Sequence, residues 1–164
     1  LASVLLVGYG PEAQRLPSLL GGADLYLDAL QDPQLGMRLA GWIRDVRGKS
    51  IDPVVIRQNW LRAYDLMTPK AAAFLNAWAQ THDPFADAGR EAITIEVLNV
   101  VPRTGDTYDL QWRETRFVNG QSAGTERWRA LITTGVEPPR TEAELMKNPL
   151  GLKIEDISWT PDAT

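Results

Sequence analysis

The sequence predicts an α+β fold in which three helices precede a four-stranded antiparallel sheet. Between residues 35 and 81, apolar residues recur at steps of three and four, which is the spacing of helices that bury one side. From residue 93 onward the period changes to two, as in strands with one apolar face. Helices followed by strands, segregated along the chain, are typical of the α+β class. We therefore expect the helices to cover the apolar face of the sheet.

The first helix is predicted to begin at Leu35 and to end at Gly48. Its charged residues are expected mostly on the side away from the apolar stripe, Arg47 among them. Two glycines inside it lower the intrinsic helix propensity, so tertiary packing has to stabilise this helix. The stripe consists of Leu35, Leu39, Trp42, Ile43 and Val46.

The second and third helices each have a clear start signal. Asp52 and Thr68 are N-cap residues, and each is followed by a proline at the first helical position. The third helix is expected to end at His82, since the residues before Pro84 disfavour helix. The predicted apolar stripes are Ile56, Trp60, Leu61, Tyr64 and Met67 for the second helix, and Ala71, Phe74, Leu75, Trp78 and Ala79 for the third.

Four strands are predicted at residues 93–98, 108–113, 128–134 and 152–159. Asn119-Gly120 is a dipeptide that favours a tight hairpin turn. The alternation of the last strand is imperfect, which predicts a bulge or a strand end near Asp156. The segment 138–151 between the last two strands is interpreted as a proline-rimmed turn.

Composition limits the classes of protein to consider. The chain has 164 residues, of which 44% are hydrophobic, enough for one domain with a single core. A net charge of -4 is the opposite of the basic footprint of a nucleic-acid binder, so no direct nucleic-acid binding is expected. The absence of cysteine excludes disulfides, thiolate metal sites and a cysteine nucleophile.

The sequence offers no arrangement typical of a catalytic, cofactor or metal site. His82 is the single histidine, and at a helix end it is expected to act as a cap or a solvated residue. No zinc-ligand spacing and no glycine-rich phosphate loop is present. The serines lack the strand–turn–helix setting of a nucleophile. We therefore expect no enzyme.

Charged residues on the strands are expected on the solvated face of the sheet. Asp109 and Glu96 should point outward by strand parity, away from any apolar interior. Cross-strand ion pairs are expected among a further set, and the alternative is that this set forms a polar interaction surface. The set comprises Arg113, Glu114, Glu126, Arg127 and Arg129.

Several blocks of sequence resemble one family in their order and spacing. The blocks that resemble its helical part are Trp42–Arg47, Ile51–Tyr64, Asn76–Trp78 and His82–Phe85. Those that resemble its strands and turns are Leu110–Thr115, Gly124–Trp128, Pro138–Glu142 and Asn148–Gly151. Together they resemble the conjugal-transfer TrbF proteins, which belong to the inner-membrane-complex subunits of type IV secretion systems. The resemblance covers residues 35 to 160.

The resemblance implies a structural assembly subunit with a nuclear-transport-factor-2-like (cystatin-like) fold, in which three helices pack on a curved sheet. It implies a protein anchored in the bacterial inner membrane, with a periplasmic domain that self-associates as a homodimer and contacts other channel subunits. Residues 35–164 would form that single domain, preceded by an N-terminal segment at 1–34. The family's cytoplasmic tail and membrane helix are not seen, so either the sequence starts after the anchor or its first 30 residues depart from the family.

Two groups of residues are candidates for protein contacts. Asn148, Pro149 and Gly151 form an Asn-Pro-x-Gly turn, whose residue types suit a tight turn. In the related family this turn is associated with subunit contacts. Trp60 and Tyr64 share one side of the second helix at a four-residue step, and they are candidates for an aromatic contact patch.

Two other functions stay open at this stage. A ketosteroid-isomerase-like enzyme or small-ligand binder of the same fold would need a deep apolar pocket with a carboxylate inside. A generic adaptor outside secretion would need no such pocket. Self-association through an apolar surface, with no desolvated carboxylate, favours the assembly subunit.

Overall fold

A computed structural model of the chain describes residues 33–162. The predicted N-terminal segment 1–34 therefore lies almost entirely outside the described residues. The chain divides into two compact units, one made of Arg38–Gly135 and Lys153–Thr164, the other of Leu1–Met37 and Val136–Leu152. Most of the three predicted helices and most of the sheet belong to the first unit, and residues 136–152 before the last strand belong to the second.

Three helices come first, as predicted. They are α4 (Pro33–Arg47), α5 (Pro53–Tyr64) and α6 (Pro69–Thr81). Both predicted N-caps are confirmed, because the Asp52 carboxylate accepts a hydrogen bond from the Val54 amide at 2.9 Å and the Thr68 hydroxyl accepts one from the Ala71 amide at 3.3 Å. Each cap satisfies an amide that the first helical turn leaves without a partner.

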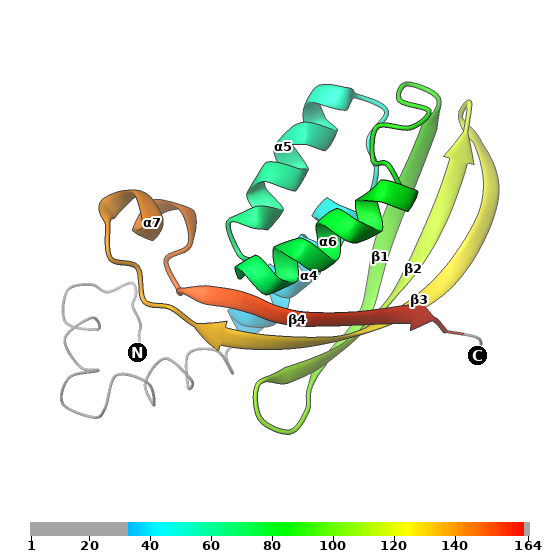
Figure 1. The fold of residues 1–164 in the computed structure, drawn as a ribbon. Helices are drawn as coiled ribbons and strands as arrows, with labels where there is room; N and C mark the ends of the chain where they lie inside the picture. Colours follow the sequence, from blue (N-terminus) through cyan, green and yellow to red (C-terminus); the bar gives the residue numbers. More distant parts are fainter. Residues whose placement is uncertain (1–32, 163–164) are drawn as a thin grey trace. The chain divides into compact units, whose positions relative to one another are not determined.

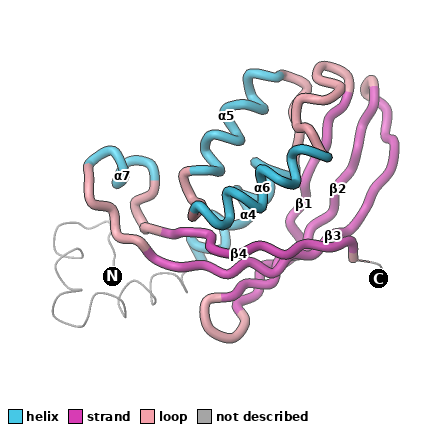
Figure 2. Tube along the Cα trace, in the orientation of Figure 1, coloured by secondary structure: helices cyan, strands magenta, loops and turns pink. Residues whose placement is uncertain are grey.

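The strands form one antiparallel meander in sequence order, so the predicted α+β fold is confirmed. They are β1 (Glu91–Pro102), β2 (Thr107–Val118), β3 (Gln121–Val136) and β4 (Leu152–Pro161). Asn119 and Gly120 both have positive φ, at 50° and 80°, and form the predicted two-residue hairpin between β2 and β3. Figures 1 and 2 show the curved strands with the helices lying along one side.

Both edges of the sheet are tied to the linkers between helices. After α4, Lys49 makes an antiparallel bridge with Ile93 of β1, with two backbone hydrogen bonds of 2.9 Å. After α5, Met67 makes a parallel bridge with Ile154 of β4. Because β1 and β4 are the outer strands, these bridges fix the helices across one face of the sheet.

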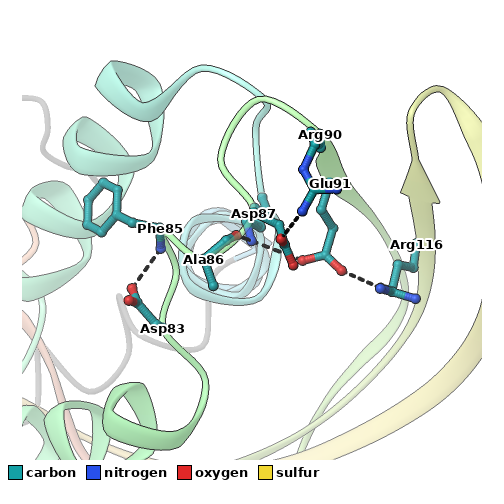
Figure 3. A network of polar contacts seen from close by, with 8 residues as sticks. Asp83, Phe85, Ala86, Asp87, Arg90, Glu91 and Arg116 are labelled. Carbon is teal, nitrogen blue, oxygen red and sulfur yellow. Dashed lines mark hydrogen bonds and ion pairs between the residues drawn. The ribbon is translucent and has the colours of Figure 1, made fainter.

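The loop between α6 and β1 is held by polar contacts rather than by packing (Figure 3). The Asp83 carboxylate accepts a hydrogen bond from the Phe85 amide at 2.8 Å. Asp87 has a φ of 56° and pairs with Arg90. At the start of β1, Glu91 pairs with Lys49 at 2.9 Å and with Arg116 of β2. The loop therefore closes on the same linker that is bridged to β1.

The structure corrects several predictions, four of which concern the helices and strands. A short helix, α7 (Glu142–Lys147), lies within the segment that the sequence indicated as a plain turn. The strand predicted at residues 93–98 continues to Pro102 past a register shift at Leu98. Leu61 is 55% exposed, although it was placed on a buried stripe. Ile56, Trp60 and Ala63 define the buried side of α5, and Leu61 lies about 100° around the helix from Trp60. Arg47 is the fourth correction and is described with the site below.

Candidate interaction sites

The Asn-Pro-x-Gly turn is rigid because three hydrogen bonds hold it. The buried Asn148 side chain donates from Nδ2 to the Leu152 carbonyl at 2.6 Å. The Gly151 amide donates to the Asn148 carbonyl at 3.0 Å, and the Gly151 carbonyl accepts from the Glu137 amide at 2.7 Å. Asn148 and Gly151 are thus internal to the turn, and Pro149 is the exposed member of the predicted set.

The turn leaves no room for a side chain at Gly151. Its φ is 66°, in the left-handed region that favours glycine. A Cβ at this position would lie 2.5 Å from the Glu137 carbonyl oxygen and 2.9 Å from the Glu137 carbonyl carbon. The Glu137 backbone can therefore lie this close to Gly151 only because Gly151 has no side chain.

Trp60 and Tyr64 lie together, as the four-residue step predicts, but not as an exposed patch. Their ring centroids are 6.2 Å apart. Trp60 is only 8% exposed, and the Tyr64 hydroxyl donates to the side-chain oxygen of Asn76 on α6. Partial burial raises the pKa of Tyr64. Trp60 therefore serves the core, and a role of the pair in protein contacts stays a prediction.

The outward side of α5 carries exposed apolar residues. Ile51 precedes the helix, and Val54 and Leu61 lie seven residues apart along it, with Arg57 between them on the same side. We call these four residues the α5 ridge. The exposed fractions are 57% for Ile51, 61% for Val54 and 55% for Leu61.

Arg47 at the end of α4 is buried in the interior, which corrects its predicted outward placement. It lies four residues after Ile43 and therefore on the buried side of the helix. Its Nε and Nη2 donate to the two carboxylate oxygens of Glu114 on β2, at 2.6 and 3.1 Å. The Trp112 indole donates to the same carboxylate at 2.8 Å. Glu114 is thus a structural partner of Arg47, not a member of the solvated face.

Four tryptophan rings surround the Arg47 guanidinium. Its central carbon lies 4.0 Å from the ring centroid of Trp128, 4.9 Å from Trp159, 5.0 Å from Trp78 and 5.9 Å from Trp112. Cation–π attraction of this kind is strongest where water is excluded, and Arg47 is 6% exposed. Its Nη1 has no hydrogen-bond partner among the described residues. The rings and the carboxylate together offset the cost of burying this charge.

Trp159 of β4 connects the rings to the rest of the core. Its ring lies 6.2 Å from Trp42, 5.4 Å from Phe74 and 5.3 Å from Trp78, measured between centroids. Trp78 in turn stacks on His82 at 4.5 Å. The single histidine therefore caps α6 and covers an aromatic ring, in agreement with its predicted place at the helix end.

The opposite face of the sheet carries the cross-strand ion pairs, with partners that differ from those predicted. Arg113 pairs with Glu96, and Arg129 and Arg103 both pair with Asp109. The register sets Arg113 opposite Arg127 and Glu114 opposite Glu126, so the predicted pairs within that set do not form. The hydrogen bond from the Arg129 guanidinium lowers the pKa of Asp109 below its ordinary value, and Arg103 lowers it further. Burial acts in the opposite direction but does not outweigh the two arginines.

On the side of the sheet that the helices cover, the Arg47–Glu114 ion pair and the tryptophan rings around it fill the interior. Among residues 33–162, no group of three or more acidic or histidine side chains is placed to hold a metal ion. Within the same residues, no helix is both long and apolar enough to cross a bilayer. Asp109 and Glu96 lie on the other face of the sheet from Trp112, as strand parity predicts. The predicted solvent exposure of Asp109 is wrong, because its side chain is only 2% exposed and is paired with Arg103 and Arg129. Exposed large apolar residues of the described surface include Val54 and Leu61 on α5 and Leu145 and Met146 on α7.

A comparison with protein families shows to which family the chain belongs. A model described as "VirB8 protein" matches residues 28–162. The chain belongs to the VirB8 family. The resemblance to TrbF is confirmed by a relative from Rhizobium radiobacter named "Conjugal transfer protein TrbF", which is 29% identical over 161 residues, or 96% of this chain and 73% of that protein.

Solved structures of VirB8-like proteins share the fold. The VirB8 protein of Agrobacterium tumefaciens superposes with a TM-score of 0.70 at 13% identity, over 79% of this chain and 92% of that one. A TrwG component of the type IV secretion system from Bartonella birtlesii gives 0.67 at 16% identity, over 81% of this chain and 94% of that one. Since identity is low, these likenesses concern the fold alone.

Proposed function

We propose that this VirB8-family chain is a structural subunit of a conjugative type IV secretion system and acts as an assembly scaffold. The observation that carries the proposal is the family match over residues 28–162, together with a relative named for conjugal transfer that aligns over 96% of the chain. The pairing of the buried carboxylates supports it, because Glu114 is held by Arg47 and Trp112. Asp109 is held in the same way by Arg103 and Arg129.

The proposal also covers where the protein is located in the cell and which proteins it contacts. The domain at residues 35–164 resides in the periplasm, and the full-length protein is anchored in the inner membrane. It forms homodimers and contacts other channel subunits, without catalysis and without direct binding to nucleic acid. The Asn148–Gly151 turn presents Pro149 as a contact, because the hydrogen bonds around it fix its backbone.

Co-purification from conjugating cells tests this proposal. An affinity-tagged full-length protein is expected to purify from the membrane fraction together with other transfer proteins of the same plasmid. The matched control is the same tagged protein in cells that lack the other transfer genes, where it should purify without them. Recovery from the soluble cytoplasmic fraction, free of transfer proteins in both strains, would contradict the proposal.

A further inference from the structure

Helix α7 exposes its apolar side chains. None of its six residues is buried, and Leu145 and Met146 are 37% and 79% exposed. A helix this short is not stable by itself in water. At its N-terminal end the Thr141 hydroxyl accepts from the Glu144 amide and the Glu144 carboxylate accepts from the Arg140 amide, both at 3.1 Å. At its C-terminal end the Asn148 amide donates to the Glu144 carbonyl at 2.8 Å. The chain thus maintains a short helix in which no residue is fully buried.

The charges beside these apolar residues differ between α7 and the α5 ridge. On α7, Glu142 lies one turn before Met146 and therefore on the same side of the helix. On the α5 ridge, Arg57 lies between Val54 and Leu61. An apolar patch with a carboxylate faces an apolar patch with a guanidinium more favourably than it faces itself, because like charges across a contact repel.

We propose that α7 of one copy docks on the α5 ridge of a second copy of this chain. Met146 and Leu145 of the first copy cover Val54 and Leu61 of the second, and the Glu142 carboxylate faces the Arg57 guanidinium. The inference rests on the proposed function, because it names one contact through which copies of an assembly subunit associate with each other. Both partners are chosen from this chain because the two patches complement each other in charge and in apolar surface.

A contact of this type is heterologous, because the two patches are different. Each copy offers one α7 and one α5 ridge, so this contact can form in addition to the contact of the proposed homodimer and can link more than two copies. Each patch has only two or three exposed apolar side chains, whereas a stable interface has about 20–30 residues on each side. We therefore expect weak, reversible self-association of the isolated chain, strengthened where many copies are held close together.

Charge reversal in two variants tests the contact. Sedimentation velocity of the 164-residue chain over a wide concentration range should show reversible self-association. Arg57→Glu and Glu142→Arg should each weaken it by at least about tenfold, since each sets like charges face to face. An equimolar mixture of the two variants should associate again, because every contact between unlike copies then pairs opposite charges. Met146→Ser should also weaken association.

The matched control is Lys70→Glu, which makes the same charge change as Arg57→Glu at a position 76% exposed on α6. It should leave self-association unchanged. A wild-type chain that stays monomeric at all concentrations would overturn the inference, as would variants that associate like wild type or a mixture that shows no recovery. Each of these results leaves co-purification with other transfer proteins unaffected, so failure of this contact is distinguishable from failure of the proposed function.

Discussion

Replacing Arg47 by alanine is expected to lower the free energy of unfolding by about 3–5 kcal/mol, the range observed when one partner of a buried ion pair is removed. The substitution leaves the Glu114 carboxylate, whose side chain is 12% exposed, with the Trp112 indole as its remaining partner. It also removes the cation on which four tryptophan rings converge. Urea unfolding followed by tryptophan fluorescence measures the loss.

Two further variants separate the ion pair from general damage. Arg113→Ala removes a more exposed ion pair with Glu96 and should cost less than about 1 kcal/mol. Arg47→Met combined with Glu114→Gln should be more stable than Arg47→Met alone, because no unpaired charge remains buried. A loss for Arg47→Ala as small as that for Arg113→Ala would show that the pair contributes little.

Replacing Gly151 by alanine is expected to destabilise the turn before β4 by about 2–3 kcal/mol, from the left-handed backbone and the steric conflict together. The new Cβ would stand 2.5 Å from a backbone oxygen of Glu137, which a side-chain rotation cannot relieve. The change should also break the hydrogen bond from the Glu137 amide to the Gly151 carbonyl. Hydrogen exchange at that amide, together with urea unfolding, measures both effects.

Two other glycines provide graded controls. Gly120 has a φ of 80° with open space around it, so alanine there should cost about 1 kcal/mol from backbone strain alone. At Gly135 the nearest atoms belong to the flexible Glu155 carboxylate, which can rotate away, so the effect should be smaller still. Equal losses at all three positions would contradict the role of close backbone approach at Gly151.

Features that depend on neighbouring residues could be predicted from the sequence. The caps Asp52 and Thr68 and the hairpin at Asn119-Gly120 act within a few residues of themselves, so their residue types were sufficient. The apolar stripe of α4 is confirmed for the same reason, since a single helix determines which of its residues share a side. The order of these elements then led to the correct fold class.

Features that depend on distant residues were missed. Arg47 was assigned to solvent because charged residues are seldom buried without a partner, and its partner Glu114 lies 67 residues away. Helix α7 left no periodic signal because it has only six residues and none of them is fully buried. Leu61 fits a buried stripe by type, and only the contacts of Trp60 and Ala63 decide which side of α5 faces inward.

Plasmid transfer frequency tests the central claim most directly. The measurement compares donors carrying an in-frame deletion of the gene with the same donors expressing the full-length protein in trans. The account predicts that the deletion abolishes transfer without changing plasmid maintenance or donor growth, and that complementation restores it. Transfer at the wild-type frequency from the deletion strain would contradict the assignment of this chain to the conjugative apparatus.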